Sequence, residues 1–380
     1  MTAHPLATAR AAEAFLACPE DGARLKTGPG EVTCPSCGTR WPRIGKVPVF
    51  SDPDGYWGEI PQREMEPLLE EAELEGWDRA LRRRLLGETG ELRDRPDAGA
   101  DEEGAAPRGR FLYDYATDAS RADWRFLLPL NEDSRVLDIG AGWGALSMAI
   151  APEVGLVVAA DDMVERARFL EIRARQSGFD HVQPIATPAQ DIPFPDGTFD
   201  LVILNGVLEW VGLSRVRRNP RDVQRLVLEN IHRKIAPGGS LYIGIENRYG
   251  YHYFTGTPDD HTKLRGTNLM PRFMAQAWTR MRTGRDYRAY THSLDGYRRL
   301  LKSAGFGGIS FHATLPTYRN PREIIPLDDP TVFDHYATRT PARTVGRRVK
   351  VALARAGFRA GVIPRLIPHY AILATRERSR

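Results

Sequence analysis

The sequence predicts an α/β protein whose main domain is doubly wound around a mostly parallel, seven-stranded sheet, with a small cysteine-bearing domain at its N-terminus. Beyond Phe111, short apolar strands alternate with helical segments, a pattern typical of parallel sheets with right-handed crossovers. The first of these strands runs directly into a glycine-rich turn. Ligands of such sheets bind outside the carboxyl ends of the strands, so we expect the functional site at that edge.

Composition indicates a water-soluble globular chain. It has 380 residues, 42% of them hydrophobic and 27% charged, and a formal net charge of +4. No stretch approaches the roughly 18–20 continuous apolar residues that span a bilayer, and the N-terminus does not resemble a secretory signal. Three cysteines, two of them in a CxxC pair, suit a reducing compartment and a metal site better than a disulfide framework. We therefore expect a cytoplasmic protein.

Three regions follow one another along the chain. Residues 14–50 contain short strands and turns, and residues 51–110 combine an amphipathic helix with a linker. Within that second region, apolar residues recur at helical spacing over 63–86, whereas 87–110 are rich in glycine, proline and charge and predict a flexible segment. Residues 111–380 form the main domain.

Within the main domain the pattern predicts particular elements. A helix capped by Ser120 precedes the first strand. The strands are expected at 135–140, 155–161, 199–205 and 240–246. Helices are expected from about 144, over 163–177 and over 221–236.

The strongest local signal is VLDIGAGWG, residues 136–144, in which a buried strand ends in an acid and three glycines before a helix. Glycine lets the backbone turn sharply and approach a ligand without a Cβ. The spacing is GxGxG, whereas dinucleotide-binding loops have GxGxxG. This difference and the preceding acid favour S-adenosylmethionine as the ligand. The expected binding residues of this segment are Asp138, Gly140, Ala141, Gly142 and Gly144.

The second strand ends in two acids, Asp161 and Asp162. Asp161 follows Gly140 by 21 residues, where a carboxylate can accept hydrogen bonds from both ribose hydroxyls of the cofactor. The alternative is that an acid here caps the next helix, and this alternative suits Asp162 better than Asp161. We expect both acids at the cofactor site.

These segments resemble the class I S-adenosylmethionine-dependent methyltransferases. The resemblance rests on VLDIGAGWG, VVAADDMVERAR, QDIPFPDGTFDLVILNGVLEWV, IAPGGSLYIGIE and SLDGYRRLLKSAGF, which cover about 135–311 in the family's order. It implies that Ala189, Gln190 and Asp191 flank the adenine, and that Asn205 and Gly206 lie between cofactor and acceptor. One departure stands out, because many members have an acid where this chain has Pro188.

Long segments follow the strands that end near Asn205, Glu246 and Leu315. Those at 247–290 and 316–367 are expected to be lids or acceptor pockets, as long insertions at this edge often are. The first is dense in Tyr, His, Asn and Asp, a mixture that can bind a polar ring such as a sugar. It also resembles a bacterial methyltransferase subgroup encoded among cell-surface glycan and secondary-metabolite genes.

Transfer of a methyl group to a hydroxyl requires a base, which a histidine or a carboxylate can supply. His261 follows two acids that can orient it, and the resemblance places Glu209 close to the methyl group. A structural hydrogen bond inside the lid is the alternative role for His261. Glu246, His252 and His292 are weaker candidates.

The N-terminal cysteines stand in a pattern that resembles the small zinc-ribbon modules that precede or partner some methyltransferases. Cys18, Cys34 and Cys37 keep ligand spacing, and Asp21 stands where a fourth cysteine is usual. Zinc accepts carboxylate oxygen, so one structural zinc is expected here. An eroded ribbon without metal is the alternative.

The sequence thus predicts a methyltransferase for a small-molecule, secondary-metabolite or glycan acceptor, acting on oxygen. RNA methylation is the alternative reaction, although the positive charge gathers near the C-terminus and not around the expected pocket. A non-catalytic cofactor-binding regulator or scaffold is the alternative of another class.

Residues 345–359 predict a basic amphipathic helix. This helix either packs on the catalytic domain, grips a diphosphate-linked acceptor, or lies on anionic lipid. The oligomeric state cannot be predicted.

Overall fold

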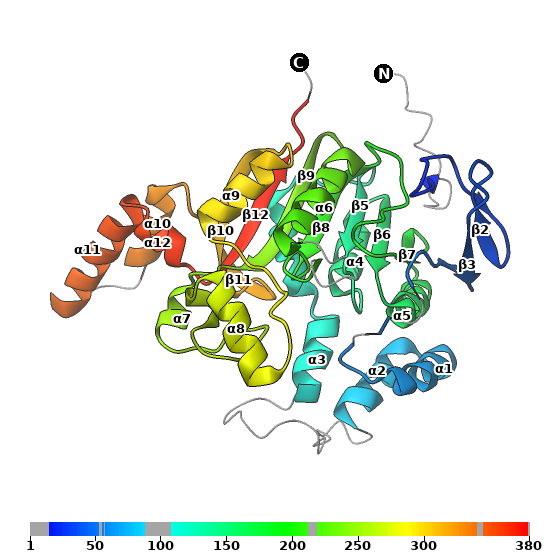
Figure 1. Cartoon of the computed structure of the whole chain (residues 1–380), viewed down its shortest axis with the longest axis horizontal. Coiled ribbons are helices and arrows are strands. Elements are labelled where there is room, and N and C mark those ends of the chain that lie inside the picture. Colours follow the sequence, from blue (N-terminus) through cyan, green and yellow to red (C-terminus); the bar gives the residue numbers. More distant parts are fainter. Residues whose placement is uncertain are drawn as a thin grey trace. The chain divides into compact units, whose positions relative to one another are not determined.

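The computed structural model describes residues 15–52, 55–56, 58–87, 108–211, 219–339 and 345–378 (Figure 1). Its strands are β1 (Lys26–Thr27), β2 (Glu31–Thr33), β3 (Arg40–Ile44), β4 (Val47–Pro48), β5 (Arg135–Ile139), β6 (Leu156–Asp161), β7 (Val182–Ala186), β8 (Phe199–Asn205), β9 (Ile235–Glu246), β10 (Gly307–Thr317), β11 (Asn320–Pro326) and β12 (His369–Thr375). Its α-helices are α1 (Met65–Glu75), α2 (Trp77–Leu86), α3 (Arg108–Thr117), α4 (Ala145–Ile150), α5 (Val164–Gln176), α6 (Pro220–Lys234), α7 (Tyr251–Phe254), α8 (Arg272–Thr283), α9 (Leu294–Ser303), α10 (Pro330–Thr338), α11 (Val345–Arg359) and α12 (Val362–Leu366).

The strands form two sheets, ordered β1-β2-β3-β4 and β11-β10-β12-β9-β8-β5-β6-β7. The larger sheet agrees with the predicted doubly wound α/β fold. In the described part of the chain it has eight strands where seven were expected, and β11 at its edge is the additional strand. The chain divides into two compact units, residues 1–202 and 203–380, with the division inside β8.

In the first unit, β5, β6 and β7 run parallel to one another. Every residue of β6 is buried, as expected for a parallel strand covered on both faces. Sequence reasoning missed β7, whose five residues include a proline that interrupts the apolar pattern. The carboxyl ends of β5 and β6 come together because Ile139 pairs with Ala160.

The small sheet of the first unit continues into the main sheet. Its last residues pair with the β7 edge, since Val49 forms a parallel bridge with Ala186. Val47 and Val49 are buried against Ala167 of α5 and Ala186. These apolar contacts anchor the cysteine-bearing domain beside β7.

Two local expectations for the first unit need correction, and a third is only partly covered by the described residues. The helix expected over 63–86 is two helices, because the chain breaks at Gly76, whose φ of 99° ends α1. The helix expected from Ser120 is a 3-10 helix, and the side chain of Asp118 caps it by accepting from the Ser120 N–H. Most of the predicted linker lies outside the described residues, and α3 begins at Arg108.

In the second unit, β12 lies antiparallel to β9, and β10 lies antiparallel to β12. Consequently β9 and β10 run in the same direction and end at the same edge, as expected for the strands that finish near Glu246 and Leu315. The segment 316–367 begins inside β10 and then forms β11, which pairs antiparallel with β10. It therefore adds an edge strand before it reaches α10 and α11.

Candidate functional site

The glycine-rich turn follows β5 and has the backbone that its sequence requires. Gly140, Gly142 and Gly144 have φ of 71°, 56° and 83°, values that residues with a Cβ rarely adopt. The backbone N–H groups of Gly140 and Ala141 donate to the Ala160 carbonyl at 2.7 and 3.0 Å. The turn is thus fixed against β6 by its own backbone.

Asp138 lies near the end of β5 and is fully enclosed by protein. The Ser147 hydroxyl of α4 donates to its Oδ2 at 2.6 Å. Burial raises the pKa of Asp138 to about 6, because a charged carboxylate is poorly solvated there. Asp138 therefore joins β5 to the helix that follows the glycine turn.

Asp161 supports the glycine turn from β6. Its Oδ2 accepts from the Gly142 N–H at 2.8 Å, and its Oδ1 accepts from the Met163 N–H at 2.9 Å. A carboxylate has about four acceptor positions, so these two bonds leave capacity for ribose hydroxyls. The helix-capping alternative for Asp162 is wrong, because α5 has Met163 at its N-cap without a side-chain cap.

The expected adenine segment follows β7. The Thr187 N–H donates to the Asp161 carbonyl at 2.8 Å, and the Thr187 hydroxyl donates to the Asp191 carbonyl at 2.7 Å. The Asp191 N–H in turn donates to the Pro188 carbonyl at 3.0 Å. These bonds fold residues 187–191 into a compact turn that includes Gln190 and Asp191.

Sequence reasoning missed that the cysteine-bearing domain holds both ends of this turn. The Phe50 N–H donates to the Ala186 carbonyl at 2.6 Å, and the Ala17 N–H donates to the Pro193 carbonyl at 2.9 Å. Burial raises the pKa of nearby Asp162, and a hydrogen bond with Ser51 opposes that rise. The domain is therefore built into the expected cofactor side of the first unit.

Glu59 is a second contribution from the N-terminal region that the sequence did not reveal. Its Oε2 accepts from the Trp143 indole N–H of the glycine turn at 3.2 Å and pairs with Arg166 of α5. Burial opposes ionisation of Glu59, but the charge of Arg166 nonetheless holds its pKa below the usual value. Glu59 is more than 80 residues from both partners in the chain. Local sequence patterns therefore could not predict these contacts.

The four expected zinc ligands lie together. Cys18, Asp21, Cys34 and Cys37 each offer a ligand atom within 4.8 Å of the others. The Cys18 and Cys37 sulfurs are 3.7 Å apart, and the Cys34 sulfur lies 3.5 Å from Asp21 Oδ1. Three sulfurs and one carboxylate oxygen are donors that zinc accepts, so the residues present fit the metal.

In the second unit, the expected base candidates lie together with a third residue. Glu209 follows β8, Glu246 ends β9, and His261 belongs to the segment after α7. Their ligand-type atoms all lie within 4.8 Å of one another. Glu209 and Glu246 are each 1% exposed, and the His261 side chain is 3% exposed. We call these three residues the acid–histidine cluster.

The electrostatics of the cluster reflect its burial. Burial, followed by the neighbouring Glu246 carboxylate, raises the pKa of Glu209 to about 8. Burial disfavours the charged form of His261, but contact with Asp259 and the charges of Glu246 and Glu209 together raise its pKa. The Glu209 carboxyl of the cluster thus exchanges its proton near neutral pH.

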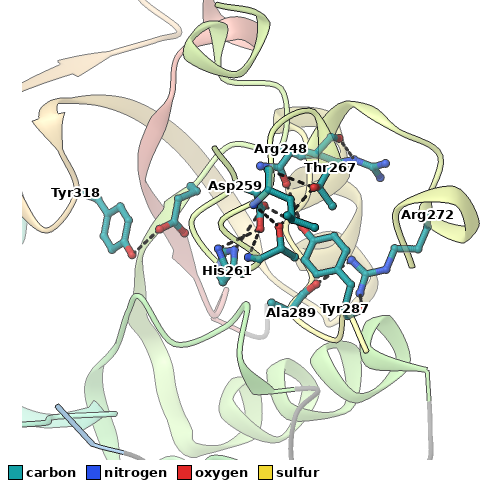
Figure 2. A network of polar contacts seen from close by, with 12 residues as sticks. Arg248, Asp259, His261, Thr267, Arg272, Tyr287, Ala289 and Tyr318 are labelled. Carbon is teal, nitrogen blue, oxygen red and sulfur yellow. Dashed lines mark hydrogen bonds and ion pairs between the residues drawn. The ribbon is translucent and has the colours of Figure 1, made fainter. Parts of the chain in front are cut away.

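Asp259 fixes the segment that carries His261 (Figure 2). Its Oδ1 accepts from the backbone N–H groups of His261 and Thr262 at 3.0 and 2.6 Å, and its Oδ2 accepts from the Tyr287 hydroxyl at 3.0 Å. His261 Nδ1 lies 3.9 Å from Asp259 Oδ2, beyond hydrogen-bonding distance. Neither ring nitrogen of His261 hydrogen-bonds to a described residue. Among the described residues, the polar contact of this ring is therefore the ion pair with Asp259 and not the structural hydrogen bond considered for it.

The remaining candidates have other surroundings. His292 Nε2 lies 2.8 Å from Gln224 Oε1, and burial lowers the His292 pKa to about 3, so this histidine joins two segments of the fold. The His252 ring contacts Tyr253 and does not belong to the cluster. The Asn205 amide is buried and has no hydrogen-bond partner among the described residues.

Comparison with known proteins agrees with this geometry. Residues 137–243 match the sequence model of a family described as "Methyltransferase domain". The uncharacterized methyltransferase YcgJ of Bacillus subtilis is 31% identical over 98 residues, which are 26% of this chain and 38% of YcgJ. The sarcosine/dimethylglycine N-methyltransferase of Halorhodospira halochloris is 35% identical over 104 residues, 27% of this chain and 35% of that enzyme. The expected methyltransferase domain is thus matched over residues 137–243.

The chain covers less than half of the length of both relatives. Chondramide synthase cmdD of Chondromyces crocatus is 34% identical over 111 residues, which are only 3% of its length. Among solved structures, geranyl diphosphate C-methyltransferase from Streptomyces coelicolor has a TM-score of 0.42 and 17% identity, covering 74% of this chain and 88% of that one. Likeness at this level decides nothing about substrate. Among the described residues, no helix is long and apolar enough to cross a membrane.

Proposed function

We propose that this chain is an S-adenosylmethionine-dependent methyltransferase that methylates a hydroxyl group of a small molecule, such as a secondary metabolite or a glycan. The observation that carries the proposal is the buried acid–histidine cluster after β8 and β9. A hydroxyl acceptor must lose its proton, and groups with pKa values near neutrality perform that task. One relative, the sarcosine/dimethylglycine N-methyltransferase, has a name that refers to small-molecule methylation.

In this proposal the first unit holds the cofactor. The glycine turn and Asp138 surround its amino-acid end, and Asp161 accepts the ribose hydroxyls, with Asp162 alongside. The adenine packs at the turn that includes Gln190 and Asp191. Asn205 of the second unit remains a candidate ligand-binding residue, because its buried amide has no hydrogen-bond partner among the described residues. Bound cofactor supplies an electrophilic methyl group, and either Glu209 or His261 takes the acceptor proton.

A comparison of small molecules from cells with and without the protein tests the function. The proposal expects a metabolite that carries an additional oxygen-bound methyl group only when the protein is present. Accumulation of the same methyl group in the RNA fraction instead would favour the alternative RNA reaction. If cofactor binds but neither fraction changes, the cofactor-binding regulator becomes the better account.

We also propose one structural zinc held by Cys18, Asp21, Cys34 and Cys37. Four protein ligands leave no open position, so the metal stabilises the domain and takes no part in catalysis. Because this domain holds both ends of the turn at 187–191, loss of zinc is expected to weaken cofactor binding as well as thermal stability.

Elemental analysis of protein purified without chelators tests the zinc site, and about one zinc per chain is the expected result. Cys34→Ser should lower zinc content, melting temperature and cofactor affinity together. Cys37→Ser, at the exposed cysteine of the site, is a milder companion variant. A metal-free protein whose melting temperature ignores chelator would instead favour the eroded ribbon.

The basic helix α11 provides a candidate peripheral membrane contact through residues 345–359. Phe358 packs on Phe333 of α10, and Asp334 pairs with Arg355 and Arg359. By contrast, Val349 and Leu353 are 52% and 67% exposed, although the packing alternative expected them to be covered. Exposed apolar residues on a basic helix suit weak, salt-sensitive binding to anionic lipid.

Co-sedimentation with phosphatidylserine vesicles tests this contact. Binding is expected at low salt and should be reduced at high salt and in Val349→Glu or Leu353→Glu. Val332→Glu, on the neighbouring α10, is a matched control that should retain binding. No binding at low salt would leave α11 as a packing or acceptor-binding element.

A further inference from the structure

The acid–histidine cluster has more unsatisfied ligand atoms than proton transfer requires. Among the described residues, neither carboxylate oxygen of Glu209 has a hydrogen-bond partner, and the same holds for Glu246 Oε2 and both ring nitrogens of His261. All three side chains are nearly inaccessible to solvent. A buried polar group without a partner is unfavourable, so this arrangement calls for a bound species.

The donor atoms of the cluster indicate the kind of species. Glu246 Oε1 already accepts from the Tyr318 hydroxyl and the Arg319 guanidinium, both at 2.9 Å. These two contacts satisfy Oε1 of Glu246. Its Oε2 and both carboxylate oxygens of Glu209 have no hydrogen-bond partner among the described residues. Two carboxyl groups and one imidazole that meet at one buried point are a donor set for a cation, which binds them with release of the protons that these groups otherwise hold.

We propose that Glu209, Glu246 and His261 bind a divalent cation of the Mn²⁺ or Mg²⁺ type. Carboxylate oxygens and an imidazole nitrogen are suitable ligands for such ions. Three protein ligands leave coordination positions open, and these would accept an oxygen of the acceptor. This inference rests on the proposed function, because it states how the same cluster holds a hydroxyl-bearing acceptor.

The surroundings of the three ligands resemble the outer shell of a metal site, where neighbouring groups hold each ligand in position. Asp259 lies behind His261, with Oδ2 3.9 Å from Nδ1, so the other ring nitrogen is available for a cation. Tyr318 and Arg319 hold Glu246 through one oxygen only. The Tyr290 N–H donates to the Glu209 carbonyl at 3.0 Å and fixes the backbone of that ligand.

Titration of the purified full chain with Mn²⁺, followed by electron paramagnetic resonance of the free ion, tests the site directly. Wild-type protein is expected to bind one Mn²⁺ ion that Mg²⁺ displaces in competition. Glu209→Gln should abolish this binding, and Tyr318→Phe, which removes a support of Glu246, should weaken it about 10–100-fold. Glu229→Gln, on the surface of α6, should bind as wild type does. Every variant keeps the four N-terminal zinc ligands, so the difference reports the cluster alone.

The outcomes separate the cation from the methylation itself. Absence of Mn²⁺ binding in folded wild-type protein overturns the cation site, and so does unchanged binding in Glu209→Gln. If wild type transfers methyl groups but binds no Mn²⁺, the proposed function stands and the cluster acts by proton transfer. Mn²⁺ binding that Glu209→Gln abolishes, in a protein that transfers no methyl group, supports the cation site and contradicts the function.

Discussion

Replacing Glu209 with glutamine is expected to lower the turnover number by about 10²–10⁴-fold. The substitution preserves side-chain shape but removes the ionisable carboxyl group from a cluster in which Glu209 lies within 4.8 Å of Glu246 and His261. An acceptor hydroxyl would then lose its proton far more slowly. Replacement of His261 by asparagine should have an effect of the same kind.

Rapid-quench measurement of a single turnover gives the chemical step, and calorimetry gives cofactor affinity for the same preparations. Cofactor affinity should stay near the wild-type value, because the glycine turn and Asp161 belong to the first unit. The surface variant Glu229→Gln is the matched control for loss of a carboxylate. Full activity in both the Glu209 and the His261 variants would remove the base assignment.

Asp161→Ala is expected to weaken S-adenosylmethionine binding by more than tenfold. The substitution removes the proposed acceptor of the ribose hydroxyls, and a hydrogen bond to a charged group contributes about 1.5–3 kcal/mol. It also removes the acceptor of the Gly142 and Met163 N–H groups, so the glycine turn loses its support from β6. Both effects lower affinity in the same direction.

Calorimetry with S-adenosylhomocysteine and its 2′,3′-dideoxy analogue distinguishes the two effects. If Asp161 binds the ribose, wild type should prefer the ligand that has ribose hydroxyls, and the variant should show less of this preference. Removing the carboxylate or removing the hydroxyls breaks the same contact, so the two changes are not additive. If Asp161 only supports the turn, both ligands should lose affinity equally. Asp180→Ala, an exposed acid of the same unit, should leave affinity unchanged, and unchanged affinity in Asp161→Ala would remove it from the cofactor site.

The sequence predicted the features that depend on neighbouring residues. The glycine turn is an example, since the positive φ of Gly140, Gly142 and Gly144 is encoded by glycine itself. The strand over 199–205 was predicted with the bounds that β8 has, because Leu201–Leu204 are four consecutive apolar residues. Likewise, the ligand spacing of Cys18, Cys34 and Cys37 correctly indicated that these side chains meet.

Features that depend on distant segments were not predictable in the same way. Glu246 was a weak candidate because its strand gave no sign that residues 209 and 261 lie beside it. Tyr287 and Asp259 hold the His261 segment but are 28 residues apart in the chain, with α8 between them. The backbone bonds from Ala17 and Phe50 to residues 193 and 186 carry no side-chain signature at all. Only the fold brings such groups together.

Methyl transfer by the purified protein tests the central claim most directly. The protein is incubated with S-adenosylmethionine that carries a deuterated methyl group and with small molecules extracted from cells lacking the protein. Mass spectrometry then locates the label, with Glu209→Gln as the inactive control. We expect the label on an oxygen atom of one small-molecule acceptor, with equivalent formation of S-adenosylhomocysteine. A protein that binds cofactor tightly and transfers no label to any small molecule, or transfers it only to RNA, would contradict the account.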